Sequence, residues 1–198
     1  MKEDILEQLV DDYLQAGGYF TRHNLKFRPR RDHPQFDRKQ DSNHSDIDVV
    51  GLHPARRGVD RVWVVSCKSW QSGFDVAAKL DEIASNKIRS GRESWRFFRE
   101  LAEPKWAEAF RAAVRDATGQ DEFTYVTAVT RIRGDASAWE NNPKFLENIG
   151  GNPIRMISLQ DMMKELLKGM TTTVVPSQLG RTVQLLHAAG AKLEWPDV

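Results

Sequence analysis

Two short segments of the chain place acidic and basic side chains at the ends of strand-like runs. HSDIDVVG contains Asp46 and Asp48, and VVSCK ends in Ser66 and Lys68. Aspartate oxygens are preferred ligands of Mg²⁺, and a lysine beside a metal-bound water is suited to contact a phosphate group. Burying a carboxylate and an ammonium is unfavourable unless they are paired or metal-bound. The segments therefore indicate a metal site for hydrolysis. Alternatively, the side chains form a salt bridge, or the lysine lies at an exposed edge of the sheet, where it discourages aggregation.

Strand alternation predicts which of these side chains share a face. In the first segment, both aspartates are expected on the face of Val50, with Ile47 and Val49 opposite. In the second, Ser66 and Lys68 are expected on one face, with the only cysteine of the chain on the other. Because that cysteine follows a hydrophobic strand, it is expected to be a buried structural thiol. Antiparallel pairing of the two strands would then bring the acidic pair and the lysine to a common face.

The elements around these strands follow from the spacing of apolar residues. Residues 4–16 have helical spacing that ends at Gly17 and Gly18. Ser158 and Asp161 have the spacing of a capping box. The other expected elements are strands at 19–27, 47–53, 61–68, 123–132 and 154–159, a loop at 28–45, helices at 74–88, on both sides of Pro104 and after Asp161, and a last helix near 178–189. This order predicts an α/β domain with a mixed central sheet flanked by helices.

Composition narrows the class of protein. The chain has 198 residues, a formal net charge of +1 and one cysteine. This length predicts one domain over residues 1–198, and the single cysteine excludes an internal disulfide framework or a cysteine-rich zinc cluster. No apolar run approaches the roughly 18 residues of a membrane span, and the charged N-terminus does not resemble a signal peptide. These features predict a soluble cytoplasmic protein.

Positive charge is concentrated in residues 20–40, called the basic segment below. The segment contains seven Lys or Arg residues and two Asp residues, which leaves a net charge of +5. Such clusters contact nucleic-acid phosphates without regard to sequence, although an exposed loop also carries charge simply because it is solvated. The candidate DNA-binding residues are Arg22, Lys26, Arg28, Arg30, Arg31, Arg38 and Lys39.

SDIDVVG followed by WVVSCKSW resembles the two central motifs of the PD-(D/E)xK, or restriction-endonuclease-like, nuclease superfamily. Asp48 stands at the Asp position of these motifs and Lys68 at the Lys position. The resemblance covers about residues 3–90 by motif and 123–168 by element order, and it implies an αβββαβ core. Ser66 departs from the pattern, because most members carry an acidic residue or Gln there. A subgroup of type II restriction endonucleases has Ser-x-Lys with a metal-binding Glu after thirteen intervening residues, and that spacing leads from Lys68 to Glu82.

The resemblance also implies roles for these residues. Asp48 and Glu82 would hold Mg²⁺ or Mn²⁺ together with the main-chain carbonyl of Cys67. Lys68 would orient or help deprotonate the attacking water, and the small Ser66 would leave room for the carboxylate from the helix. On a helical wheel Glu82 lies on the polar side, where a solvated side chain is the alternative. Other candidates to complete the site are Asp46, Gln71 and Glu7, with His44 as a base or outer partner.

Two functions follow from this reading. The first is a Mg²⁺-dependent DNA endonuclease acting in restriction, repair or defence, with a core at about residues 3–170 and a C-terminal helix and tail at 171–198. Cutting both strands would require two active sites and hence a homodimer. The second is a catalytically inactive module of the same fold that binds nucleic acid or a partner protein, which the Ser66 departure keeps open.

Overall fold

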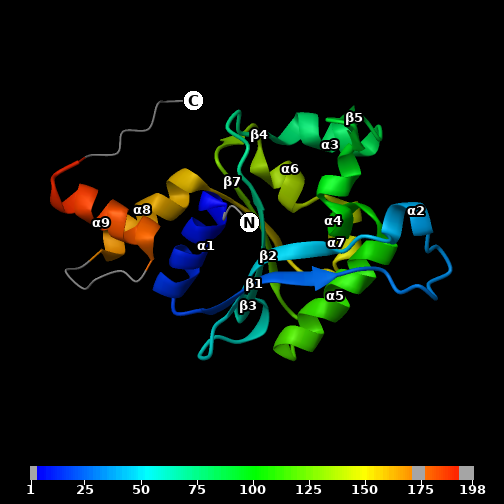
Figure 1. Ribbon diagram of the computed structural model, residues 1–198, viewed down its shortest axis with the longest axis horizontal. Helices are drawn as coiled ribbons and strands as arrows, with labels where there is room; N and C mark the ends of the chain where they lie inside the picture. Colours follow the sequence, from blue (N-terminus) through cyan, green and yellow to red (C-terminus); the bar gives the residue numbers. More distant parts are fainter. Residues whose placement is uncertain (1–3, 171–176, 192–198) are drawn as a thin grey trace.

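The computed structural model in Figure 1 describes residues 4–170 and 177–191. It has a mixed α/β architecture with a central five-stranded sheet in the order β1-β2-β3-β7-β9. The strands are β1 (Phe20–Phe27), β2 (Ser45–Leu52), β3 (Val62–Lys68), β7 (Thr124–Val129) and β9 (Ile154–Ser158). The first three pair in antiparallel fashion, whereas β7 and β9 run parallel to β3. The predicted mixed sheet and the antiparallel pairing of its two motif strands are confirmed.

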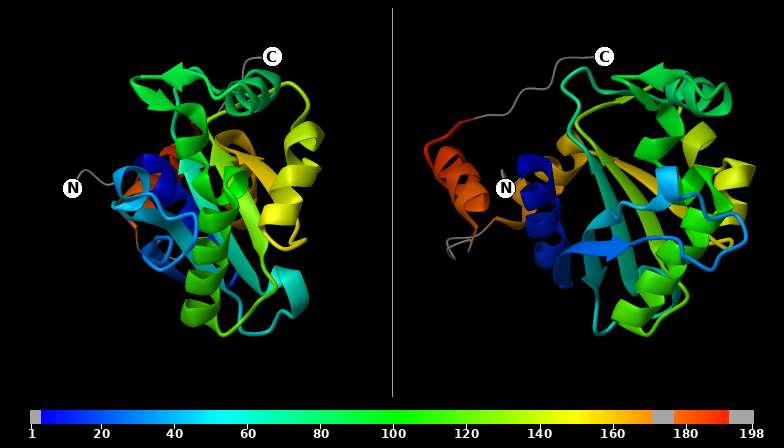
Figure 2. Two further views of the ribbon diagram at one scale, coloured as in Figure 1. Left: turned by 90° about the vertical axis from the view of Figure 1, so that its right-hand side faces the viewer. Right: turned by 45° about the vertical axis from the view of Figure 1, so that its right-hand side comes forward.

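Helices cover both faces of this sheet (Figures 1 and 2). One face carries α1 (Ile5–Ala16), α8 (Leu159–Gly169) and α9 (Gln178–Ala188), and its core joins apolar residues of α1 and α8 to Val49, Trp63 and Val65. The other face carries α3 (Val76–Ala84), α4 (Arg99–Ala102), α5 (Pro104–Thr118), α6 (Ala136–Glu140) and α7 (Pro143–Asn148). Its larger core is rich in aromatic residues, among them Phe98 and Trp106.

The smaller elements lie at the ends of the sheet. They are α2 (Arg38–Asp41), two 3₁₀ turns (Gly58–Asp60 and Ser94–Phe97), and the short strand pairs β4 (Phe74–Asp75) with β8 (Ile132–Arg133) and β5 (Ile88–Arg89) with β6 (Arg92–Glu93). No helix in the described parts of the chain is long and apolar enough to cross a bilayer.

Local chemistry explains where the main helices begin. Asp4 caps α1 by accepting a hydrogen bond from the Leu6 amide at 2.8 Å. The predicted capping box of α8 is confirmed, because the Ser158 hydroxyl and the Asp161 carboxylate each bond the backbone amide of the other residue. Pro104 occupies the first turn of α5, where its missing amide proton costs nothing.

Two predicted elements differ from the structure. The helix expected at 74–88 is confined to Val76–Ala84, because Asp75 caps its start and Phe74 instead pairs with Ile132 in β4 and β8. Asn86 has a positive φ of 51°, so the chain leaves the helix before Ile88, which lies in β5. The expected loop at 28–45 contains the short helix α2. The predicted C-terminal tail at 192–198 lies outside the described residues.

The predicted alternation of β2 is wrong at one point. Ile47 belongs to the core on the α5 side and Val49 to the core on the α1 side, although they are two positions apart and should share a face in a regular strand. The register of β1 and β2 is interrupted between them, at Asp48 and Asn24, and Asn24 has a positive φ of 53°. This irregularity turns the Asp48 side chain toward the end of β3 and away from a regular face of the sheet.

Candidate active site

Asp48 is fixed against the exit of β3. The ladder between β2 and β3 pairs Val49–Leu52 with Val62–Val65 and does not extend to the end of β3. In place of a ladder bond, Asp48 Oδ2 accepts a hydrogen bond of 2.5 Å from the backbone amide of Cys67. The carboxylate therefore lies where the ladder between the two strands ends.

Lys68 lies on the face predicted from alternation, close enough to Asp48 to lower the pKa of its carboxyl, although among the described residues no ion pair joins the two. Its Nζ donates hydrogen bonds to Ser66 Oγ at 2.8 Å and to the Cys67 carbonyl at 3.2 Å. The ammonium also lies 5.5 Å from the centroid of the Phe98 ring. Cys67 packs on the opposite face and is free and buried, as predicted. Burial raises the pKa of its thiol well above the usual value, which makes it a poor nucleophile.

Negative charge accumulates around Asp48. Burial raises the pKa of its carboxyl, and the nearby carboxylates of Asp46 and Asp4 raise it further, although Lys68 and the Cys67 amide oppose the shift. Glu7, on the first turn of α1, has a pKa raised to about 7 by burial and then by Asp48. Glu7 therefore lies near enough to Asp48 for their charges to interact, and it stays a candidate to complete the site. Carboxyls that repel one another can both be stabilised by a divalent cation.

The structure gives Glu82 partners that the sequence did not predict. Glu82 is buried, with 3% of its surface exposed, and not solvated as its place on the helical wheel suggested. Its carboxylate binds Lys79 Nζ at 2.8 Å and Arg89 Nη2 at 2.6 Å. Burial raises the pKa of this carboxyl, but hydrogen bonds from the two cations outweigh burial and lower it overall. Among the described residues no bond joins Glu82 to Asp48 or Lys68.

Sequence reasoning missed a series of buried, hydrogen-bonded polar side chains behind Lys68. The Ser66 hydroxyl bonds the hydroxyl of Tyr125, which donates a short hydrogen bond to Glu100 Oε1. Burial raises the pKa of the Glu100 carboxyl, and the Lys68 ammonium lowers it in part. Tyr125 reaches this place because it lies opposite Val64 in the ladder of β3 and β7. Glu100 comes from α4, so no spacing within one motif could have predicted it.

The remaining candidates lie at the surface. Asp46, His44 and Gln71 are exposed, and Asp46 lies opposite Lys26 in the ladder of β1 and β2. Within the basic segment, Arg30 forms an ion pair with Asp32 at 2.7 Å. The Arg28 guanidinium donates to the Ser42 carbonyl, and the other candidate cations, Arg22, Lys26, Arg31, Arg38 and Lys39, are exposed.

The donor set suits a hard cation held mainly by carboxylates. Within residues 4–170 and 177–191, no three His, Cys, Asp or Glu side chains converge closely enough to enclose a metal ion. Mg²⁺ does not require such a cage, because it keeps several waters and is often held by one or two carboxylates and a substrate phosphate. Asp48 and Glu7, with raised pKa values and mutual repulsion, are suited to this mode of binding.

Comparison of the chain with protein-family models, with curated proteins and with solved structures finds no match. A functional assignment therefore depends on the chemistry of the residues described above.

Proposed function

We propose that this chain is a Mg²⁺-dependent DNA endonuclease of the restriction-endonuclease-like class, with its active site at Asp48 and Lys68. One observation carries the proposal: the Asp48 carboxylate and the Lys68 amine, from adjacent strands, interact electrostatically near the end of β3, and a second carboxyl from α1 interacts with Asp48. The order of one helix, three antiparallel strands, helices, a parallel strand and further helices is compatible with the αβββαβ core of that class. Hydrolysis of a phosphodiester is the reaction that this set of groups suits best.

Glu7 is the stronger candidate for the second metal ligand. Its pKa responds to Asp48, whereas both oxygens of Glu82 already accept charge-assisted hydrogen bonds from Lys79 and Arg89. Recruiting Glu82 would require breaking two ion pairs at a buried position, which is costly. We therefore assign the metal to Asp48, Glu7 and the Cys67 carbonyl, with Asp46 as an outer contributor of negative charge.

The chain's own groups have separate roles in the proposed reaction. A bound divalent cation lowers the pKa of water and offsets charge on the phosphate. Lys68 binds the scissile phosphate and orients the attacking water, and its amine is held in place by the Ser66 hydroxyl and the Cys67 carbonyl. The Tyr125 and Glu100 side chains behind Ser66 fix this arrangement without contacting substrate. Ser66 is thus a positioning residue and replaces the acidic residue found in most members of the class.

The exposed cations of the basic segment are the proposed contacts to DNA. β1 is the edge strand of the sheet and pairs directly with β2, which carries Asp48. The phosphate backbone of a DNA molecule bound along β1 would therefore pass close to the proposed metal site. Such contacts supply affinity that does not depend on base sequence and that weakens with salt.

Cleavage of supercoiled plasmid by the purified protein in Mg²⁺ or Mn²⁺ tests the proposal. Lys68→Ala and Asp48→Asn should each reduce the cleavage rate by about 10²-fold or more, since each removes a group that acts on the reacting phosphate. Lys168→Ala is a matched control, because this exposed lysine pairs with Glu165 on α8. Cleavage that survives both active-site substitutions would contradict the proposal.

Because Ser66 stands where most members of the class carry an acidic residue or Gln, a second function is considered. In it the chain is a nuclease-like module that binds DNA without cutting it. In that case neither the wild type nor any variant would cleave plasmid, but salt-sensitive binding would persist. If the chain cuts both strands at once, we expect a homodimer, which sedimentation of the active protein would detect.

A further inference from the structure

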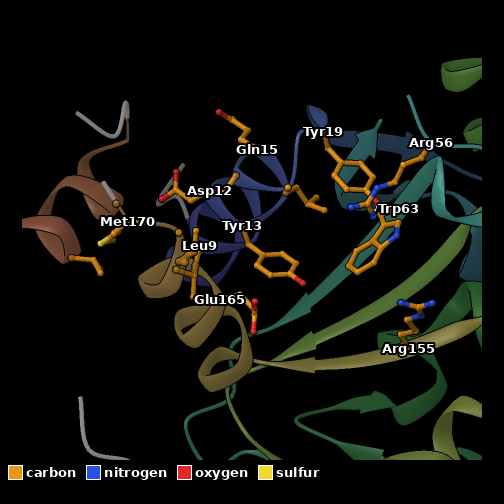
Figure 3. A pocket seen from close by; sticks show the side chains of 17 residues that line it. Leu9, Asp12, Tyr13, Gln15, Tyr19, Arg56, Trp63, Arg155, Glu165 and Met170 are labelled. Atoms are coloured by element: carbon orange, nitrogen blue, oxygen red, sulfur yellow. Dashed lines mark hydrogen bonds between the residues drawn. The ribbon is translucent and has the colours of Figure 1, made fainter. Parts of the chain in front are cut away.

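A cavity of about 770 Å³ lies on the face of the sheet opposite Lys68, between α1, α8, α9 and the side chains of β3 and β9 (Figure 3). Its volume is in the range of pockets that hold small organic molecules. Trp63 and Arg155 come from the sheet, Tyr13 from α1, and Leu166 and Val183 from α8 and α9. This cavity shares no lining residue with the Asp48 and Lys68 site.

Aromatic rings form one wall of the cavity. The centroid of the Trp63 ring lies 5.8 Å from that of Tyr19 and 6.3 Å from that of Tyr13. The Tyr19 hydroxyl donates to the Asp60 carbonyl at 2.9 Å and accepts from Arg56 Nη1 at 2.8 Å. These bonds hold Tyr19 and Arg56 in place, so this wall is ordered before any ligand binds.

One buried donor in this wall has no partner. Trp63 is only 8% exposed, and its indole Nε1–H makes no hydrogen bond to any described residue. An unsatisfied buried donor costs about 1–3 kcal/mol, and most buried donors in native proteins are satisfied. Because this nitrogen has almost no accessible surface, a ligand in the cavity would contact the Trp63 ring and not its N–H.

Positive charge flanks the same indole. Figure 3 shows the Trp63 ring between the side chains of Arg56 and Arg155. The Arg155 guanidinium lies 5.8 Å from the centroid of the Trp63 ring and 3.6 Å from Asp60, and its side chain is 53% exposed. Glu165 lies farther along the cavity, where it raises the pKa of Tyr13 after burial. The cavity is therefore basic at the Trp63 end and acidic at the α8 end.

We propose that this cavity binds a small aromatic oxyacid. The acid group pairs with Arg56 and Arg155, while the flat apolar body lies between α1, α8 and α9 beside the rings of Tyr13 and Trp63. Glu165 disfavours a second anionic group at the far end. The site is independent of the proposed nuclease activity, because none of Asp48, Lys68 and Glu7 lines the cavity.

Side-chain NMR of the ¹⁵N-labelled full chain tests this inference. The chain has six tryptophans, and the Trp63 indole signal is assigned by its absence from Trp63→Phe. Addition of 1-naphthoate should shift the Trp63 indole signal in a saturable way, as expected for a ring that lines the occupied cavity. A parallel titration with 1-naphthyl phosphate shows whether a carboxylate or a phosphate fits better, and binding by either supports the proposal.

Two comparisons make the test specific. The neutral 1-naphthalenemethanol should bind at least tenfold more weakly than 1-naphthoate. Arg155→Gln should weaken 1-naphthoate binding at least tenfold, whereas Arg115→Gln, which alters an exposed arginine of α5 paired with Asp121, should leave it unchanged. No shift with either acid at millimolar concentration, equal affinity for the alcohol, or full affinity in Arg155→Gln would each overturn the proposal.

Discussion

The chain contains two pairs of an aspartate and a lysine at buried or partly buried positions, and they differ in how far their charges are compensated. Asp41 is fully buried and accepts from Lys105 Nζ at 2.7 Å, from Trp106 Nε1 at 3.0 Å and from the Asp37 amide at 2.8 Å. Burial alone would raise the pKa of Asp41, but these donors lower it overall. The pair joins α2 to α5, and the charge of its carboxylate is compensated.

Asp48 and Lys68 form the contrasting pair. Burial and like charges leave the pKa of Asp48 raised, although Lys68 and the Cys67 amide partly compensate it. The carboxyls of Asp41 and Asp48 thus have opposite pKa shifts. The Asp41 carboxylate has all the partners it needs, whereas the Asp48 carboxyl would gain from binding a cation. Carboxyls with raised pKa values of this kind are concentrated at functional sites.

The largest effect that separates the two pairs should be on stability. Asp41→Asn leaves the Lys105 ammonium without a buried counter-charge and should reduce the free energy of unfolding by about 3–5 kcal/mol. Asp48→Asn keeps an acceptor for the Cys67 amide and removes repulsion, so its effect should stay within about 1 kcal/mol. Urea unfolding monitored by circular dichroism measures both. Equal losses in the free energy of unfolding of the two variants would contradict the distinction between Asp41 and Asp48.

Tyr125→Phe should have the next largest effect. The substitution removes the hydroxyl that links Glu100 to Ser66, and a buried group left without its partner costs about 1–3 kcal/mol. Because the Ser66 hydroxyl holds the Lys68 amine, plasmid cleavage should also fall in a folded sample. Tyr13→Phe, on the other face of the sheet, serves as the control. Full cleavage by Tyr125→Phe would show that this chain of side chains does not position Lys68.

The local sequence predicted the two strands, their antiparallel pairing and the face of Lys68, because alternation and turn length act over a few residues, but it did not predict the break in alternation around Asp48. It did not predict Glu100 and Tyr125, which reach Lys68 only through packing of α4 and β7 against β3. The burial of Glu82 was missed for a similar reason, since Arg89 lies on a separate hairpin. Spacing within a motif identifies neighbours along a strand, but it does not identify the cations that compensate a carboxylate.

A smaller effect is expected in the pH dependence of stability. Glu7 is surrounded by Asp48, Asp4, His23 and Asp46, and its folded pKa of about 7 exceeds the ordinary value of 4.5. The folded state therefore binds the proton more tightly, and stability should fall as pH rises between these values. Glu7→Gln should remove about 1 kcal/mol of that decrease, a modest amount because water screens a partly exposed carboxylate. Urea unfolding at about pH 5 and about pH 8 without divalent cations measures it, and an unchanged slope would contradict the role of Glu7.

The smallest effect concerns single cations of the basic segment. Lys39→Ala should reduce the slope of log affinity against log salt by about 0.9 for duplex DNA, the value for one lost phosphate contact. Arg30→Ala should change the slope less, because Asp32 already pairs with Arg30. Fluorescence anisotropy at several salt concentrations distinguishes the two. A larger change for Arg30→Ala would place the DNA elsewhere on the protein.

Mn²⁺ binding followed by electron paramagnetic resonance tests the proposed metal site most directly. We expect the wild type and Glu82→Gln to bind one Mn²⁺ with similar affinity, and Asp48→Asn and Glu7→Gln to bind it at least tenfold more weakly. Undiminished binding by Asp48→Asn would contradict a cation site where β2 and β3 separate. Loss of Mn²⁺ binding in Glu82→Gln, with full binding in Glu7→Gln, would show that Glu82 of α3, and not Glu7, is the second metal ligand.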